Sequence, residues 1–153
     1  MKTVSKYTIS IIFVATLCIL VNGNAEVVAD GSKLAKDKQT WVSKGDALNR
    51  MGNFSQAIIA YDTALKIDPN YLNALDGKGW SLNGLGNYTQ AIVYLDKALK
   101  IDPNHLDGLV FKAQALYNIG NYTGAKYYSE KAFEIDPKSP ALKRLPEVFR
   151  KSQ

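Results

Sequence analysis

The sequence predicts an all-α protein in which three helical hairpins stack into a solenoid. The first observation behind this prediction is a period of 34 residues, marked by Ile-Asp-Pro at residues 67–69, 101–103 and 135–137. The second is a Gly-Asn-aromatic-Ser/Thr motif that recurs in step at residues 52–55, 86–89 and 120–123. A fixed period of roughly 20–50 residues is typical of repeat proteins, in which each copy buries its apolar face only against its neighbours.

Each copy contains two amphipathic helical segments. Apolar residues at helical spacing include Trp41 and Leu48 in one segment, and Ala57, Tyr61 and Ala64 in the next. The glycine of the recurring motif is expected to end the first helix, because glycine tolerates the left-handed conformation of a C-cap. The Asp-Pro step ends the second helix, since proline lacks the N–H that a helix interior needs.

The copies at residues 38–71, 72–105 and 106–139 resemble tetratricopeptide repeats. That family has small residues at positions 8, 20 and 27 of each copy and proline at position 32, and all twelve positions comply here if Gly45, Gly79 and Ala113 are counted at position 8. The resemblance implies a right-handed superhelical solenoid whose concave groove, lined mainly by the first helices, grips a peptide or protein segment.

Residues 140–153 are expected to form a short C-terminal capping helix that ends in a basic tail. Ser139 and Pro140 make a favourable helix start, with serine as the cap and proline at the first position. Pro146 should interrupt the helix, so the predicted seal over the last repeat is short and broken. Its apolar residues are Leu142, Leu145, Val148 and Phe149.

The first 25 residues read as a signal peptide. Lys2 and Lys6 give a positive start, residues 9–21 are almost all apolar, and Gly23 and Ala25 suit cleavage before Glu26. The apolar run is shorter than the roughly 20 residues of a membrane-spanning helix. The segment therefore predicts an exported protein, secreted or in the cell envelope; the alternative is an uncleaved anchor that holds the protein on a membrane.

The remaining composition limits the chemistry of the chain. Residues 26–37 read as a polar linker, and Cys18 of the signal is the single cysteine, so the mature part has no thiol for disulfides, catalysis or metal binding. His105 is the single histidine and is expected on the surface between repeats. The sequence has no phosphate-binding glycine loop or nucleophile elbow. We expect no enzyme activity, cofactor or metal.

The charge distribution does not favour nucleic-acid binding. The whole chain carries a net charge of +5, and because Lys2 and Lys6 are the only charges in the first 25 residues, the rest carries +3. The charges are interspersed, and the groove that the resemblance implies is acidic, whereas nucleic-acid binding needs a basic face.

The resemblance places positions 2, 5, 9, 12 and 13 of each copy on the concave face. Amide side chains there suit the backbone of an extended peptide, Trp80 and Tyr117 suit aromatic anchors, and three aspartates favour a neutral or basic ligand. The candidate groove residues are Gln39, Val42, Asp46, Asn49, Arg50, Asn73, Asp76, Trp80, Asn83, Gly84, Asp107, Val110, Gln114, Tyr117 and Asn118.

Several of these candidate groove residues also have an interpretation that involves no ligand. The amides are also ordinary solvated positions, and Trp80 has the alternative of turning inward beside Gly84. Gly77 and Gly84, unusual inside a helix, either admit a ligand backbone or are tolerated drift. The carboxylate clamp of tetratricopeptide co-chaperones is not expected, because its matching positions hold no cation: Val42, Asp46, Gly77, Asp107 and Phe111.

Asn53, Asn87 and Asn121 each begin an N-glycosylation sequon at the same turn of the repeat. Asparagine is equally a favoured helix N-cap, and Gln56 and Gln90 follow three residues later, as in a capping box. Both interpretations fit the sequence.

The sequence as a whole predicts an exported, non-enzymatic scaffold that binds an extended peptide or protein segment in its groove. The alternative is a structural component of the envelope, self-assembling through the ends or the convex face of the solenoid and forming a homo-oligomer.

Overall fold

The computed structural model describes residues 31–150, and side chains from Lys36 onward. The predicted signal segment at residues 1–25 and Cys18 lie outside the described residues. The chain divides into two compact units, residues 1–34 and 35–153. Of the first unit only residues 31–34, the start of a helix, are described; the repeats belong to the second.

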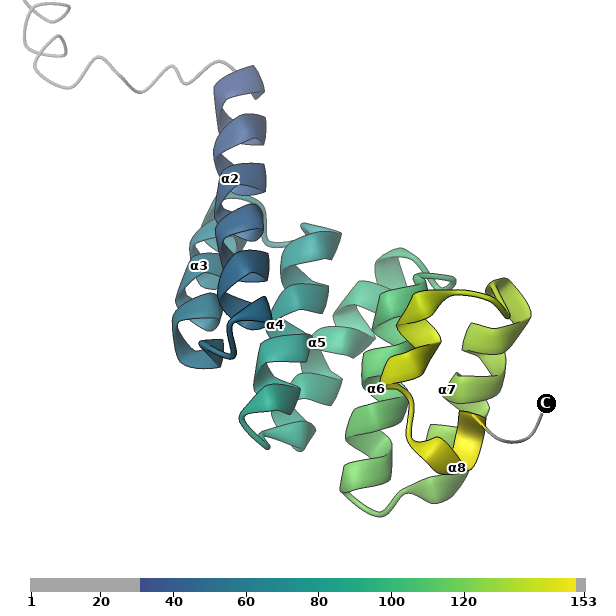
Figure 1. The fold of residues 1–153 in the computed structure, drawn as a ribbon. Helices are drawn as coiled ribbons and strands as arrows, with labels where there is room; N and C mark the ends of the chain where they lie inside the picture. The colour runs from purple at the N-terminus through teal and green to yellow at the C-terminus, as the bar shows by residue number, and fades with distance from the viewer. Residues whose placement is uncertain (1–30, 151–153) are drawn as a thin grey trace, which may run out of the picture. The chain divides into compact units, whose positions relative to one another are not determined.

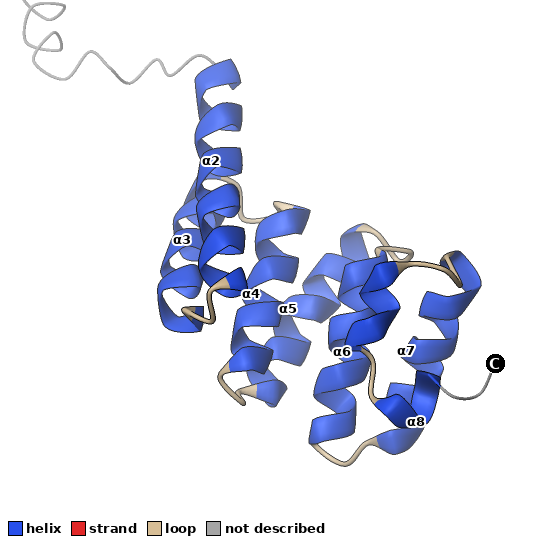
Figure 2. Cartoon of the chain, in the orientation of Figure 1, coloured by secondary structure: helices blue, strands red, loops and turns tan. Residues whose placement is uncertain are grey.

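The part of the chain that the structure describes is all-helical, as the sequence predicts (Figures 1 and 2). Three hairpins follow one another, each with a first helix (α2, α4 and α6) and a second helix (α3, α5 and α7). In chain order the elements are α2 Gly31–Arg50, α3 Phe54–Ile67, α4 Leu72–Gly84, α5 Tyr88–Ile101, α6 Leu106–Asn118, α7 Tyr122–Ile135, the 3₁₀ helix η1 Pro140–Arg144, and α8 Glu147–Arg150.

The turn inside each hairpin follows the glycine mechanism expected from the sequence. Gly52, Gly86 and Gly120 adopt positive φ angles of 76°, 79° and 84°. In the first hairpin Asn53 N donates to Leu48 O at 2.9 Å, which satisfies a carbonyl at the end of α2. Because the three turns share this geometry, the hairpins are copies of one another.

The first helix starts earlier than the repeat pattern suggests. We expected a polar linker over residues 26–37, but α2 begins at Gly31 and runs without a break to Arg50. Residues 31–37 contain neither proline nor a second glycine, so nothing in their composition stops the helix from extending toward the N-terminus.

Each hairpin packs on its neighbours through a small apolar core. In the first hairpin, Val42 packs with Tyr61, Ala57 and Ala64 of α3. Ala74, from α4 of the next hairpin, joins the same cluster. The alanines at the repeated positions are fully buried, and their small side chains allow the helix axes to approach closely. α4 thus packs on α3, α5 and α6, which joins the three hairpins into one continuous stack.

Two lysines also connect neighbouring hairpins. The Lys78 ammonium pairs with Asp62 of the preceding hairpin and donates to the Tyr94 hydroxyl at 3.0 Å. The same arrangement recurs one repeat later in Lys112, Asp96 and Tyr128. Each ammonium is mostly buried, and its opposite charge and hydroxyl partner offset the cost of burial.

The C-terminal segment covers the last hairpin as expected. The Ser139 hydroxyl accepts from Ala141 N at the start of η1, and Pro146 separates η1 from α8. Leu142 and Leu145 are buried in the core of the third hairpin, whereas Val148 is 60% exposed. The seal therefore depends on η1. No helix among residues 31–150 is both long and apolar enough to span a membrane.

Candidate functional site

Side chains from all three first helices line a pocket of about 260 Å³, which we call the groove pocket. It gathers three carboxylates, two arginines and a histidine around two aromatic rings. The lining residues are Asp46, Arg50, Asn73, Asp76, Gly77, Trp80, His105, Asp107, Phe111 and Arg144. Residues three and four apart on one helix share a face, so the spacing within α4 turns Asn73, Asp76, Gly77 and Trp80 toward this pocket.

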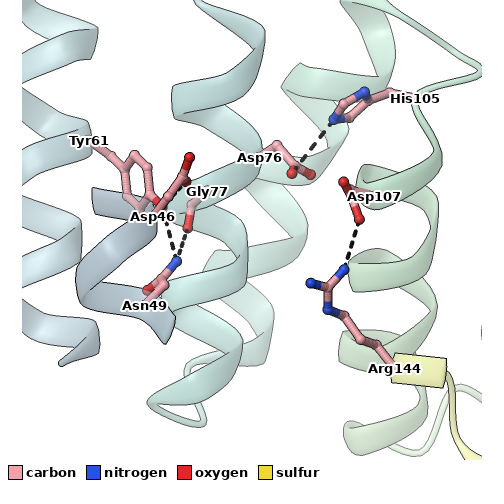
Figure 3. A network of polar contacts seen from close by, with 8 residues as sticks. All are labelled: Asp46, Asn49, Tyr61, Asp76, Gly77, His105, Asp107 and Arg144. Carbon is pink, nitrogen blue, oxygen red and sulfur yellow. Dashed lines mark hydrogen bonds and ion pairs between the residues drawn. The ribbon is translucent and has the colours of Figure 1, made fainter. Parts of the chain in front are cut away.

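A buried aspartate and a half-buried histidine form the floor of the groove pocket. Asp76 is 8% exposed, and its Oδ2 lies 3.6 Å from His105 Nε2 (Figure 3). Asp76 Oδ1 has no hydrogen-bond partner among the described residues. Burial raises the pKa of Asp76, and the contact with Asp76 raises the pKa of His105. Both groups therefore hold a proton more firmly than they would in water.

An arginine from the capping segment reaches into the same pocket. Arg144 Nη1 lies 3.1 Å from Asp107 Oδ1, and Figure 3 shows the side chain extending from η1 toward the start of α6. Its guanidinium carbon lies 5.4 Å from the ring centroid of Trp80 and 5.5 Å from that of Phe111. The two rings stack at 5.5 Å with an interplanar angle of 7°. This arrangement combines an ion pair with cation–π contacts.

A hydrogen-bonded network supports the other end of the groove pocket. The Tyr61 hydroxyl donates to Asp46 Oδ1 at 2.7 Å (Figure 3). Asn49 Nδ2 donates to the Tyr61 hydroxyl at 3.1 Å and to Gly77 O at 3.2 Å. Burial raises the pKa of Tyr61, and the hydrogen bond to Asp46 adds to the rise. Tyr61 thus remains a hydrogen-bond donor that fixes the Asp46 carboxylate.

Six of the candidate groove residues meet in the pocket: Asp46, Arg50, Asn73, Asp76, Trp80 and Asp107. Four others lie outside its lining. Gln39 accepts a hydrogen bond from the Tyr71 hydroxyl, and Asn118 donates to the backbone of Gln114. Tyr117 packs edge-on against Tyr122 and Phe149, so it contacts the capping segment.

Four predicted groove residues prove to be interior residues. Val42 and Val110 are 2% and 0% exposed and belong to the core. Asn49 and Asn83 are also buried, and Asn83 Nδ2 donates to Phe111 O of the next hairpin at 2.8 Å, as Asn49 does to Gly77 O. Positions 5 and 12 of the repeat lie seven residues apart and so share one side of the helix. For Val42, Asn49 and Asn83 that side faces the next hairpin, whereas Asp76, at position 5 of the second copy, lines the pocket.

Gly77 and Gly84 of α4 have a packing role. The sequence interpretations, access for a ligand backbone or tolerated drift, did not include it. A β-carbon on Gly77 would lie 2.4 Å from the Tyr61 ring, and one on Gly84 would lie 2.6 Å from the Phe54 ring. Trp80 therefore does not turn inward over Gly84; instead it stacks on Phe111 with one part of its surface exposed.

His105 and Arg144 are the pocket residues that the sequence did not identify. His105 lies at the boundary between two copies and was expected on the surface, but as the N-cap residue of α6 it is held beside Asp76. Arg144 lies 37 residues from its partner Asp107 and outside the repeats. The one available signal was the basic run Lys143-Arg144 directly after a predicted capping helix.

The three sequon asparagines are exposed at the hairpin turns, but they differ in structure. Asn121 Oδ1 accepts from Gly124 N at 2.9 Å and caps α7. Within the described chain, Asn53 and Asn87 make no side-chain capping bond although they occupy the N-cap position. The capping-box expectation is therefore wrong for these two residues.

Among residues 31–150, no group of three or more His, Cys, Asp or Glu side chains is placed to hold a metal ion. The carboxylates of the groove pocket instead face cationic side chains and a hydroxyl group.

Comparison with known proteins agrees with this geometry. Family models described as tetratricopeptide repeat match residues 39–71 and 82–145, which together make up more than half of the chain. No sequence among the curated proteins matches.

Solved structures share the fold. The tetratricopeptide domain of Sgt2 from Aspergillus fumigatus is 26% identical, with a TM-score of 0.67 over 74% of this chain and 77% of that one. The first such domain of Spaghetti (RPAP3), bound to the HSP90 peptide SRMEEVD, is 16% identical, with a TM-score of 0.68 over 76% and 90%. The translocator chaperone SycD from Yersinia enterocolitica is 18% identical, with a TM-score of 0.65 over 74% and 86%. This chain is therefore a member of the tetratricopeptide repeat family.

Proposed function

We propose that this chain is a non-enzymatic scaffold whose groove pocket binds an extended peptide or protein segment of a partner. The observation behind the proposal is the convergence of three first helices on one pocket that contains polar, charged and aromatic side chains together. Such a mixture offers an aromatic anchor, hydrogen-bonding groups for a backbone and charges for selectivity.

The charges of the pocket favour a neutral to basic segment. Its three aspartates exceed the two arginines when His105 is neutral, and one of these arginines, Arg144, already pairs with Asp107. The Spaghetti (RPAP3) domain is bound to SRMEEVD, a peptide with three acidic residues. We propose a different preference here, because the repeat positions that match the clamp contain two aspartates and no cation.

Site-specific crosslinking tests the proposal. A photoreactive phenylalanine analogue at Asn73, an exposed residue of the groove pocket, should capture a partner in cells that produce the full-length chain. The matched control carries the analogue at Val93, which is 50% exposed on the second helix α5. Capture from Asn73 and not from Val93 supports groove recognition. Capture from Val93 alone, or from neither position, contradicts it.

One observation favours the alternative of self-assembly through the convex face. Each second helix presents an exposed apolar residue at the same repeat position, namely Ile59, Val93 and Tyr127, which are 66%, 50% and 55% exposed. Single exposed apolar residues are ordinary, but a repeated one indicates a possible contact surface. Sedimentation tests this function: an oligomer that Ile59→Lys/Val93→Lys dissociates, and that Asn73→Lys leaves intact, would support it.

Export is a further proposal, supported by the apolar segment at residues 9–21 and the small residues before Glu26. We propose that in a host with the glycosylation machinery Asn53 and Asn87 are modified before Asn121, whose amide oxygen is engaged by its own helix. Removal of glycans by an endoglycosidase should then increase gel mobility, and Asn53→Gln/Asn87→Gln should abolish most of that change. Unchanged mobility of the exported chain would contradict the proposal.

A further inference from the structure

The capping segment shows which chemical group the groove pocket accepts. The guanidinium of Arg144 is held by the Asp107 carboxylate at 3.1 Å and faces the stacked rings of Trp80 and Phe111. A planar guanidinium both pairs with a carboxylate and stacks on aromatic rings, which an ammonium ion does less well. The pocket therefore has the parts of an arginine-binding site.

Arg144 is held loosely enough to be exchanged. Its side chain is 45% exposed, and that of Asp107 is 46% exposed. Exposed ion pairs contribute at most about 1 kcal/mol. The adjoining leucines, Leu142 and Leu145, keep η1 attached to the third hairpin without Arg144. Movement of this one side chain would free the carboxylate and the aromatic rings while the fold remains intact.

Asp76 provides an independent indication of a missing hydrogen-bond partner in the groove pocket. Its side chain lines the groove pocket and is 11% exposed, and its buried Oδ1 atom has no hydrogen-bond partner among the residues described. A buried polar atom without a partner is costly. The positive groups that line the pocket are Arg50, His105 when protonated, and Arg144, and of these only His105 pairs with Asp76.

We propose that the groove pocket is a subsite for an arginine side chain of the bound segment, and that Arg144 occupies this subsite in the free chain. The inference rests on the proposed function and specifies its ligand. An incoming arginine takes the Asp107 carboxylate and the Trp80 and Phe111 rings, Arg144 turns to solvent, and the unpartnered Oδ1 of Asp76 in the same pocket offers a further hydrogen-bond acceptor.

A small probe tests the subsite without any partner protein. The experiment titrates N-acetyl-arginine amide into ¹⁵N-labelled protein and follows the indole N–H of Trp80, one of two tryptophans in the chain. N-acetyl-citrulline amide is the neutral probe of similar shape. We expect saturable shifts with the arginine probe alone, and affinity increased up to about fivefold in Arg144→Gln, the limit set by a surface ion pair.

Two variants make the result specific. Lys143→Gln removes the neighbouring exposed charge, which does not line the pocket, and should leave affinity unchanged. Asp107→Asn should weaken binding of the arginine probe about fivefold or more. Circular dichroism of each variant confirms that it folds.

Three results would overturn the inference. They are equal chemical-shift changes with both probes, no chemical-shift change when the arginine probe is added to Arg144→Gln, and weaker binding of the arginine probe by that variant. Binding of the peptide SRMEEVD that Arg144→Gln abolishes would also overturn it, because Arg144 would then act as an anion-binding residue. Failure of the arginine probe together with specific crosslinking at Asn73 rejects the subsite and retains the scaffold. Failure of the crosslinking alone rejects the scaffold.

Discussion

The ring of Tyr61 occupies the space into which a side chain at Gly77 would extend. A β-carbon on Gly77 would lie 2.4 Å from Cε1 and Cζ of that ring, and one on Gly45 would lie 2.6 Å from the same two atoms. Tyr61 is fully buried and is thus held between α2 and α4. Its hydroxyl then reaches Asp46, so the lack of side chains at Gly45 and Gly77 lets Tyr61 position a carboxylate of the groove pocket.

Gly77→Ala should therefore destabilise the protein although alanine is the better helix former. Overpacking of a core costs about 1–3 kcal/mol, whereas the gain in helix propensity is about 1 kcal/mol. In a Tyr61→Ala background the same substitution should instead stabilise, because the ring is gone. Urea unfolding of the four proteins measures both signs, and destabilisation of equal size in both backgrounds would contradict the packing explanation.

The buried asparagines should matter for stability in a defined order. Asn49→Ala removes bonds to Tyr61 and Gly77 and should cost about 1–3 kcal/mol. Asn83→Ala should cost less, since Asn83 makes one bond and its Oδ1 has no partner among the described residues. Asn118→Ala, which removes a bond within an exposed turn of α6, should change the free energy of unfolding by less than about 0.5 kcal/mol. Thermal and urea unfolding would establish the order.

The pairing of His105 with Asp76 should make stability depend on pH. The pKa of His105 is raised above its ordinary value of 6.5, so its contribution is complete below that pH and is lost as pH rises through the folded value. The raised pKa of Asp76 acts in the same direction. The free energy of unfolding should therefore fall as pH rises above about 6.5, the ordinary pKa of histidine.

His105→Gln should flatten this dependence, because His105 is the only histidine of the chain. The lowered pKa of Asp68, which results mainly from its bond to Lys38, has the opposite sign and acts in acid, below its ordinary value of 3.8. The two effects are therefore separated in pH. A variant that keeps the full slope above about pH 6.5 would show that another group is responsible.

The capping segment should contribute most of its stability through η1 and Leu145, the residue that follows it. Leu145 is 1% exposed in the core of the third hairpin, so Leu145→Ala should cost about 2–5 kcal/mol. Val148, which is 60% exposed, is the matched control, and Val148→Ala should have little effect. Similar melting temperatures for the two variants would mean that the segment does not seal the solenoid.

Parts of the groove pocket were predictable because position within a repeat determines which way a side chain faces. Asp46 and Trp80 share position 9, and both line the pocket. The same reasoning failed for Val42 at position 5 and Asn49 at position 12, which face the next hairpin, whereas Asp76 at position 5 of the second copy does line the pocket. Assigning a position to the concave face requires the rotation of each helix about its axis, which a small set of packing contacts decides.

The sequence by itself determined the hairpins, their number, their glycine-capped turns and the interrupted cap. These features depend on local propensities and on a period that every copy repeats. Only the tertiary structure decided that His105 pairs with Asp76, that Tyr61 fills the space beside Gly77, and that Arg144 reaches Asp107 from 37 residues away. The physical reason is that such contacts join residues on different helices, so they exist only after the hairpins have packed.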